Sequence, residues 1–508
     1  MGQIFTSDQL TKNIEERCQV CVIGSGAGGG AIAAELAENG VEVLILEEGG
    51  YYTSKDFSSD PAKAIPMLYR DAGTSVILGS PSIIFSEGRC VGGSTVINGG
   101  MCWRTPERVL KRWQFEFGLK DITPKAMEPF FEKVEERINV APQAPESLSR
   151  AEMLIHQAVN KLGYLIRRNR RNQKNCTGEG LCVFGCPTDR KQSVLITYIP
   201  RAINNGARLY ADCKAVKILA KNGRAVGVLA HILDRETGKK KYKMKIQADL
   251  VIVAGGAIQT PALLLGSRLG NAFKQVGKNF LCHPNTKVIG IFDQEVRYWA
   301  GVHQGHQVHE FLEEGLLFAL GGVHPSLVAI SLPSFGEKNL EMMELWNYMV
   351  AGGVLVDDTT YGRVMRAPWG SALAFYQIDH IEYERLLKGV AILSEIMFTA
   401  GARKVLLPFF SLQELNSIDE IPKIYDYKIK PSEIELLTVH AFGTTRMCAN
   451  PRRGVVDQWG ECHEVSRLFI VDGGIIPTSL GVNPQETIMA LATRTGQYIL
   501  ENKSKYLS

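Results

Sequence analysis

The sequence predicts an α/β protein whose main domain is a doubly wound, Rossmann-like nucleotide-binding fold. Apolar runs rich in β-branched residues, typical of buried parallel strands, occur at 19–24, 41–46, 248–254 and 466–472. Glycines and an alanine-rich segment of strong helix formers follow the first run. Because such strands occur near both ends of the chain and in its middle, we expect the domain to be discontinuous in sequence.

The first β-α-β unit carries a dinucleotide-binding pattern. Gly24 permits a tight turn, Gly26 lets the backbone approach a pyrophosphate, and Gly29 allows close helix packing. The helix over 30–37 would then direct its amino terminus at the phosphates. Glu47, which ends the second strand, would accept hydrogen bonds from the ribose hydroxyls and disfavour a 2′-phosphorylated cofactor. The alternative is a glycine-rich turn of another α/β protein.

Later elements extend the same pattern. Glycines after 248–254 turn the chain into a helix that begins at Thr260, with Pro261 at a tolerated early position. A helix over 484–500 closes the chain, and the amphipathic segment 337–348 predicts a covering helix. The histidine-containing segment 303–309 lacks companion metal-ligand spacing, and we interpret it as pocket or surface.

Composition excludes several classes of protein. A chain of 508 residues exceeds the size at which one hydrophobic core stops growing, so two joined domains are expected. A net charge of +4 gives no indication of a nucleic-acid partner. The sequence has no signal-peptide pattern and no apolar run near the roughly 18 residues that a membrane span needs. We therefore expect a cytoplasmic protein without an integral membrane segment. Export together with a partner subunit is the open alternative. Eleven cysteines, an odd number, argue against a disulfide scaffold.

Three further segments resemble the glucose–methanol–choline (GMC) family of flavin oxidoreductases. They are GRCVGGSTVINGG at 88–100, GAIQTPALLLGS at 256–267 and HAFGTTRM at 440–447. Together with the first glycine loop, they stand in the family's order and cover essentially the whole chain. The resemblance implies FAD. Some family members attach FAD through a histidine in the glycine-rich segment, and because 88–100 contains none, we expect FAD to be bound noncovalently.

The resemblance also implies how the chain is divided and which residues bind FAD. The FAD-binding domain would comprise 14–110, 195–290 and 435–508. The segment 111–194, which carries three of the cysteines, would connect its parts, and 291–434 would form a separate inserted α+β substrate domain on an antiparallel sheet. Gly24, Gly26, Gly29 and Glu47 would hold the ADP part. Gly92, Gly93, Ser94 and Asn98 would contact the pyrophosphate and flavin, and Val216 would lie beside the adenine. Asp472 and Gly473 would approach the ribityl chain, and Pro484 and Thr487 the flavin ring.

Two residues are the candidates for catalysis. His440 is the histidine that precedes the GTTRM motif, and a neutral imidazole can take the hydroxyl proton of an alcohol as hydride leaves for the flavin. Asn483 matches the family's second polar residue, which can hydrogen-bond the same oxygen. The alternative is a packing histidine and an asparagine that merely starts a helix.

Three cysteines lie close together in sequence. Cys176, Cys182 and Cys186 have the spacing C-x5-C-x3-C with glycines between them, and three thiolates suffice for a [3Fe–4S] cluster. The loop looks like that of the catalytic subunit of bacterial FAD-dependent glucose dehydrogenases. Buried structural thiols, a zinc site and a redox disulfide are the alternatives. The basic run 167–174 is either a solvated face or a docking site for an acidic electron acceptor.

These features predict an enzyme that oxidises an alcohol to a carbonyl with FAD. Electrons would leave through the cluster to a redox partner protein or a quinone. A lipophilic alcohol is favoured, because the segment 354–364 is similar to the branch that oxidises long-chain alcohols and sterols. The alternatives are a sugar or polyol dehydrogenase, an oxidase using dioxygen, a NAD-dependent dehydrogenase, and a non-catalytic electron-transfer subunit.

Overall fold

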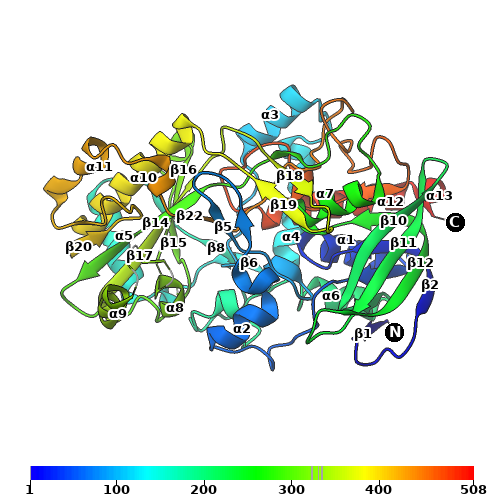
Figure 1. Cartoon of the computed structure of the whole chain (residues 1–508), viewed down its shortest axis with the longest axis horizontal. Coiled ribbons are helices and arrows are strands. Elements are labelled where there is room, and N and C mark those ends of the chain that lie inside the picture. The colour runs from blue at the N-terminus through cyan, green and yellow to red at the C-terminus, as the bar shows by residue number, and fades with distance from the viewer. Residues whose placement is uncertain (1, 322–323, 330, 333, 335, 508) are drawn as a thin grey trace.

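Two large sheets, each with its own hydrophobic core, dominate the molecule, and two small sheets of three and two strands accompany them. The computed structural model describes residues 2–507 except 322–323, 330, 333 and 335. Figure 1 places the two halves side by side along the longest axis, with the first sheet towards the carboxyl terminus and the second at the opposite end. No helix in the described part of the chain is long and apolar enough to cross a membrane.

The first sheet is mixed and contains the predicted parallel strands. β12 (Lys240–Val253) pairs in parallel with β2 (Ile14–Ile23) and with β23 (Leu468–Ile470), and antiparallel with β11 (Arg224–Leu233). All four apolar runs overlap strands of this sheet, so the predicted α/β character is confirmed. In spatial order the strands are β1 (Gln3–Phe5), β9 (Arg208–Tyr210), β3 (Val43–Leu46), β2 (Ile14–Ile23), β12 (Lys240–Val253), β11 (Arg224–Leu233) and β10 (Cys213–Lys221), with β23 (Leu468–Ile470) also on β12.

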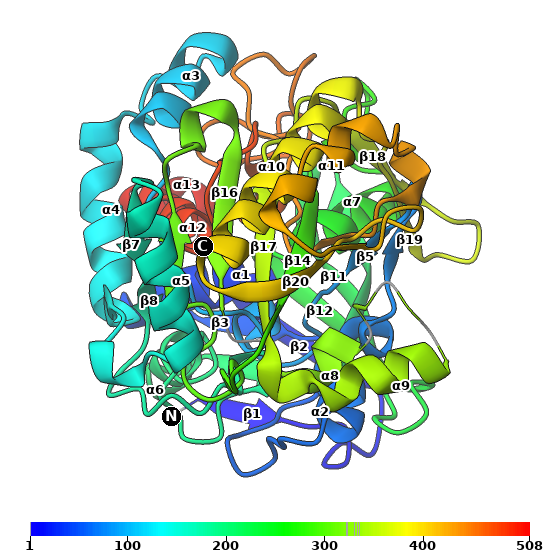
Figure 2. The ribbon, with the colours of Figure 1, turned by 90° about the vertical axis from the view of Figure 1, so that its left-hand side faces the viewer.

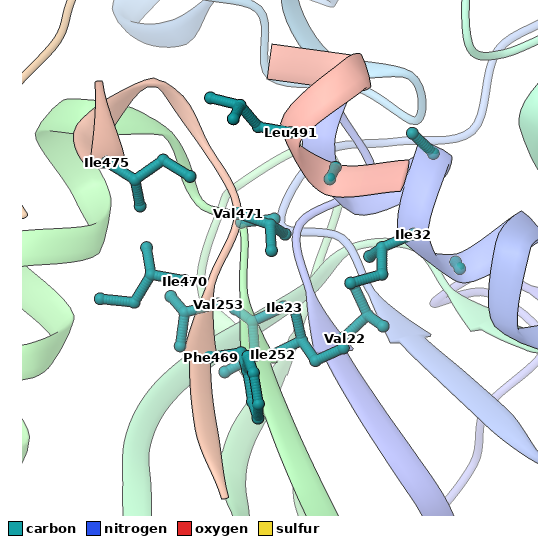
Figure 3. Close-up of a cluster of buried hydrophobic side chains, with 14 of the residues drawn as sticks. Val22, Ile23, Ile32, Ile252, Val253, Phe469, Ile470, Val471, Ile475 and Leu491 are labelled. Atoms are coloured by element: carbon teal, nitrogen blue, oxygen red, sulfur yellow. The ribbon is translucent and has the colours of Figure 1, made fainter. Parts of the chain in front are cut away.

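Helices α1 (Ala27–Glu38) and α12 (Gln485–Glu501) pack together against this sheet. Figure 3 shows Ile32 of α1 beside Val22 of β2, Leu491 of α12 on the side of Val471, and Phe469 further along its strand, next to Ile252. These side chains are fully or almost fully buried. Because the packing of these apolar side chains fixes α1 against the sheet, it also fixes the first glycine loop at the amino end of α1.

Helix α7 (Gly256–Ser267) begins four residues earlier than the sequence predicts, so that Pro261 lies inside it. Proline lacks the N–H that would bond the carbonyl of Ala257. The hydroxyl of Thr444 donates to that carbonyl instead, at 2.6 Å. A tertiary contact therefore compensates for the proline and lets the helix start at the glycine turn.

The second sheet is antiparallel except where β22 pairs with β5. Helix α10 (His380–Thr399) packs across β14 and β17, and Figure 2 shows it in front of them. The antiparallel sheet that the resemblance implies is thus present. Its strands are β4 (Val76–Ile77), β5 (Ile83–Phe85), β22 (Leu436–Thr438), β14 (Asn285–Phe292), β17 (Met349–Val356), β16 (Leu316–Leu320), β15 (His306–Val308) and β7 (Ile166–Arg168), with β20 (Ala402–Leu406) on β14 and β21 (Glu414–Leu415) on β20.

Shorter elements cover the two sheets. The covering helix predicted at 337–348 is present as α9 (Glu337–Glu344) and a following 3-10 turn. The division of the chain at 110, 194, 290 and 434 stays a prediction. The remaining longer elements are α2 (Pro61–Leu68), α3 (Glu107–Phe117), α4 (Pro124–Arg137), α5 (Arg150–Lys161), α6 (Tyr198–Asn204), α8 (Pro325–Ala329), α11 (Lys423–Asp426), α13 (Lys503–Tyr506), β6 (Val140–Pro142), β8 (Arg170–Asn172), β13 (Lys278–Phe280), β18 (Gly362–Arg366) and β19 (Ala372–Phe375).

Candidate active site

Three polar side chains meet at one edge of the second sheet. β14 runs antiparallel to both β17 and β22, so its amino end lies beside the carboxyl ends of those strands. Asp357 follows β17, His440 lies just beyond β22, and His283 precedes β14. Sheet topology therefore gathers residues that are far apart in the sequence.

His440 is held through one ring nitrogen. Its Nδ1 lies 3.1 Å from Nδ1 of His283, and the two rings meet edge to face with centroids 5.2 Å apart. Burial lowers the pKa of His440 well below its usual value, and His283 lowers it further. Burial also lowers the pKa of His283, to about 3. Both rings are therefore neutral near pH 7, and Nε2 of His440 is the nitrogen that can face a substrate.

Asn483 is positioned from the second sheet. Nε2 of Gln307, a buried residue of β15, donates to Oδ1 of Asn483 at 3.1 Å. Oε1 of Gln307 in turn lies 3.3 Å from Nε2 of His309. Because Oδ1 of Asn483 is occupied, its amide Nδ2 is the group free to donate to a substrate oxygen. The segment 303–309 thus lies directly behind the candidate site.

The loop that carries Asn483 also reaches the histidine pair. Oγ of Ser479 lies 2.7 Å from Nε2 of His283. Two hydrogen bonds therefore link His440, through His283, to the loop that carries Asn483. A cavity of about 240 Å³ opens beside this loop, with Arg108, Glu313 and Val482 in its lining.

Two expected cofactor glycines are needed for packing. A Cβ at Gly24 would lie 2.3 Å from the carbonyl oxygen of Ala254, and one at Gly29 would lie 2.0 Å from that of Gly24. Gly24 has φ 98° and Gly92 has φ 93°, both in the left-handed region. These positions therefore admit only glycine, and the tight turn and close helix packing expected from the sequence are both present.

Gly26 differs from them, because the space beside it is open. A Cβ there would meet only the Cα of Gly93, at 3.8 Å. The two glycine loops thus face each other at the amino end of α1, where free backbone N–H groups attract phosphate. Glu47 accepts hydrogen bonds from the hydroxyl of Ser25, at 2.6 Å, and from its backbone N–H, at 3.0 Å. This open cradle fits the diphosphate of FAD, with the carboxylate of Glu47 beside it.

Asp472 and Gly473 lie just beyond β23, where Asp472 contacts the start of α7 and Gly473 approaches the segment that carries His440. The carboxylate of Asp472 accepts hydrogen bonds from the backbone N–H of Gly256, at 2.9 Å, and from the hydroxyl of Thr260. Burial raises the pKa of Asp472 to about 6. A Cβ at Gly473 would lie 2.5 Å from the carbonyl oxygen of Ala441, next to His440. Asp472 therefore anchors the strand end that the resemblance places near the ribityl chain.

The start of α12 meets the second glycine segment. Nδ2 of Asn98 donates to Oε1 of Gln485 at 2.8 Å, and the hydroxyls of Thr105 and Thr487 lie 2.8 Å apart. Pro484 is the N-cap of α12. These expected flavin contacts are thus brought together at one helix terminus.

Two further cofactor contacts are expected, from Ser94 in the second glycine segment and from Val216 in β10. The hydroxyl of Ser94 accepts from the backbone N–H of Gly88 at 3.0 Å, within the second glycine segment. Val216 lies in β10, where the pairing register with β11 shifts between Ala215 and Lys217. Such a bulge leaves backbone groups unpaired, which suits the adenine contact expected of Val216.

The three loop cysteines line one small cavity of about 20 Å³. Burial alone would raise the pKa of Cys182, but the charges of Arg171 and Lys191 hold it below its usual value. Nη2 of Arg171 contacts Sγ of Cys182 at 3.1 Å, and the backbone N–H of Lys191 contacts Sγ of Cys186 at 3.4 Å. Nevertheless, no three His, Cys, Asp or Glu side chains in the described ranges are arranged to hold a metal ion.

Lys191 connects the cysteine loop with the expected flavin site. Its buried Nζ donates to the carbonyls of Val96, at 2.6 Å, of Asn98, at 2.9 Å, and of Cys182. Burial lowers the pKa of Lys191 to about 8. The cysteine loop therefore packs directly behind the second glycine segment.

Comparison with known proteins identifies the family. Models of the GMC oxidoreductases match residues 65–285 and 368–492. An uncharacterised GMC-type oxidoreductase of Mycobacterium tuberculosis is 34% identical, over 94% of this chain and 75% of its own length. This chain belongs to the GMC oxidoreductase family. GMC membership supports an FAD-dependent oxidoreductase.

Other GMC relatives are similar at lower identity. A long-chain-alcohol oxidase of Arabidopsis thaliana is 27% identical, over 94% of this chain and 67% of its own length. A structure of Aspergillus oryzae formate oxidase, studied for its FAD modification, has a TM-score of 0.75 at 14% identity and covers 97% of this chain and 99% of its own. This likeness confirms the α/β fold. The comparisons lend no support to the likeness of the cysteine loop to glucose dehydrogenases or to a [3Fe–4S] cluster.

Sequence reasoning missed His283 and Gln307, which contact the candidate catalytic residues, Ser479, which contacts His283, and Lys191, which contacts the cysteine loop. His283, Ser479 and Gln307 are polar residues without a recognisable motif. One available signal was the buried character of the segment around Gln307, in which three of the ten histidines fall.

Proposed function

We propose that this chain catalyses the FAD-dependent oxidation of an alcohol to a carbonyl compound, with His440 as the base. The observation that carries the proposal is the neutral, buried imidazole of His440, connected through His283 and Ser479 to the loop that presents Asn483. A depressed pKa keeps this imidazole unprotonated near neutral pH, so that its lone pair is available.

Each residue has a distinct part in the proposed reaction. FAD, when bound, supplies the acceptor for the hydride. Nε2 of His440 takes the hydroxyl proton of the alcohol, and Nδ2 of Asn483 donates a hydrogen bond to the same oxygen. Gln307 holds the amide of Asn483 in the orientation that directs this donor to the substrate. Burial of the histidine pair excludes water that would otherwise compete for the proton.

A lipophilic alcohol is the favoured substrate class, with a sugar or polyol as the alternative. The long-chain-alcohol oxidase relative supports this choice. The cavity of about 240 Å³ beside the 479–483 loop is lined by Glu107, Arg108 and Glu313 among others and by neither His440 nor Asn483, so it favours neither class.

The test is anaerobic reduction of the purified flavoprotein by a panel of primary alcohols of rising chain length, with glucose and sorbitol for comparison. We expect bleaching of the flavin by the alkyl alcohols. His440→Ala should slow it at least about 100-fold. His231→Ala, on β11 in the first sheet, is the matched control and should retain the rate. Equal rates in the two variants would exclude His440 as the base.

We further propose that Cys176, Cys182 and Cys186 hold an iron–sulfur cluster that passes electrons to a redox partner protein or a quinone. The three cysteines share one cavity, and Arg171 and Lys191 favour the thiolate of Cys182, whereas burial raises the pKa of Cys176. The cavity has room for about one water molecule, so the loop must close around a cluster as it forms. Iron and sulfide analysis, with a triple serine variant as control, tests this; iron-free protein that consumes dioxygen would favour an oxidase instead.

A further inference from the structure

A chain of hydrogen bonds leads from His440 to a partly exposed carboxylate. Nδ1 of His440 contacts Nδ1 of His283 at 3.1 Å, and Nε2 of His283 contacts Oγ of Ser479 at 2.7 Å. The hydroxyl of Ser479 donates to Oδ1 of Asp357 at 2.8 Å. The side chain of Asp357 is 17% exposed and lies 3.7 Å from Nη2 of Arg108, whereas His283 is completely buried.

The direction of each hydrogen bond follows from the carboxylate. A carboxylate only accepts, so Ser479 must spend its single proton on Asp357. The hydroxyl oxygen of Ser479 can then only accept from His283, which places the proton of neutral His283 on Nε2. Nδ1 of His283 must therefore accept from His440, whose own proton lies on Nδ1. This leaves Nε2 of His440 with a free lone pair.

One contact opposes this arrangement. The backbone N–H of Leu480 points at Nε2 of His283 from 3.3 Å, which would favour an unprotonated Nε2. It is much longer than the 2.7 Å contact with Ser479. A hydrogen bond to an ionised acceptor is also roughly twice as strong as a neutral one. The bond from Ser479 to Asp357 therefore decides the direction of the chain.

We infer that Asp357, acting through Ser479 and His283, selects the tautomer of His440 that can serve as a base. The role of that base rests on the proposed function, whereas the tautomer itself does not. In the reversed arrangement Nε2 of His440 would carry a proton and would have no lone pair with which to accept the proton of the alcohol. Asp357, Ser479 and His283 are thus positioning residues.

The same chain can carry the proton away from the site. When Nε2 of His440 gains a proton, its Nδ1–H passes to Nδ1 of His283, and Nε2–H of His283 passes to Oγ of Ser479. The hydroxyl proton of Ser479 then passes to the carboxylate of Asp357, which exchanges with water. At each step one bond to hydrogen breaks and one forms, and no electrons are transferred. The four residues thus lead a proton to solvent without a buried charge remaining, and because the transfer leaves the proton of His440 on Nε2, the starting tautomer must be restored before the next turnover.

The tautomer can be read directly from long-range proton–nitrogen correlation spectra of the holoenzyme labelled at its histidine nitrogens, with His440 assigned from His440→Ala. We expect the proton of His440 on Nδ1. In Ser479→Ala the backbone N–H of Leu480 is the remaining group within hydrogen-bond distance of Nε2 of His283, while the carboxylates of Asp357 and Asp358 stay about 4 Å away, so the proton of His440 should move to Nε2. Flavin reduction by alcohol should then slow about 100-fold. Ser479→Thr keeps the hydroxyl and should restore both readings.

Two further variants complete the test. Asp357→Asn removes the charge that orients the chain and should also move the proton of His440 to Nε2, which provides a reading if Ser479→Ala fails to fold. Glu313→Gln removes the exposed carboxylate that lies 3.6 Å from the same Arg108 and should leave the spectrum unchanged. A wild-type proton on Nε2, or an unchanged position in the folded Ser479 or Asp357 variant, would overturn the inference. The expected spectra without flavin bleaching by any alcohol would instead overturn the proposed function alone.

Discussion

At the scale of single residues, burial determines what His440 can do. An exposed histidine is half protonated near pH 6.5, whereas desolvation disfavours the charged imidazole of His440. The contact with His283 does not reverse this, because His283 is itself neutral and buried. A neutral partner can orient the ring without raising its pKa.

This predicts an unusually flat acid limb in the pH profile. Because the pKa of His440 is depressed, its base form persists as the pH falls through about 6.5. The anaerobic rate of flavin reduction at saturating alcohol should stay constant from about pH 8 to about pH 6 and decline only in more acidic solution. Circular dichroism at each pH checks that the fold is retained. A rate that halves near pH 6.5 would mean that the base titrates like an exposed histidine.

At the scale of elements, the start of α1 separates glycines that build the fold from a glycine that leaves room for a cofactor. A Cβ at Gly28 would lie 1.7 Å from the carbonyl oxygen of Val471, an impossible contact with backbone. A Cβ at Gly26 would touch only Gly93 at an ordinary van der Waals distance. The same helix terminus therefore contains both kinds of position, two residues apart.

Alanine substitutions at these two positions should have opposite effects. Gly28→Ala should destabilise the protein by on the order of 3 kcal/mol or prevent folding, because backbone must move. Gly26→Ala should fold normally but lose affinity for FAD at least tenfold, since the new methyl group occupies the open cradle. Chemical unfolding and FAD titration of the deflavinated proteins measure the two quantities. Full FAD affinity in Gly26→Ala would place the diphosphate elsewhere.

At the scale of the whole molecule, the candidate site lies where the two halves meet. His283 and Asp357 come from the second sheet, whereas Ser479 and Asn483 come from the loop that leads into α12 of the first half. Lys191 likewise joins the cysteine loop to the second glycine segment. A cofactor bound here contacts both halves, and so it should stabilise the whole chain.

Removal of FAD should therefore lower the melting temperature in a single transition. Adding FAD at one hundred times its Kd should restore about 2.7 kcal/mol of stability. FMN, which lacks the adenosine that Glu47 and Val216 are expected to contact, is the matched control and should stabilise far less. Differential scanning calorimetry of the deflavinated protein makes the comparison. Equal stabilisation by FMN would argue against an adenosine site in the first glycine loop.

The sequence by itself determined the α/β class, the nucleotide-binding loop, the GMC motifs and the candidates His440 and Asn483, because these depend on local hydrophobic patterns and short spacings. Only the tertiary structure decided what surrounds those candidates. His283 and His440 are 157 positions apart, and His283 and Ser479 are 196 apart. No local pattern records such contacts, since they arise when antiparallel strands bring distant ends to one sheet edge. The direction of the proton chain from His440 to Asp357 is therefore a property of the fold.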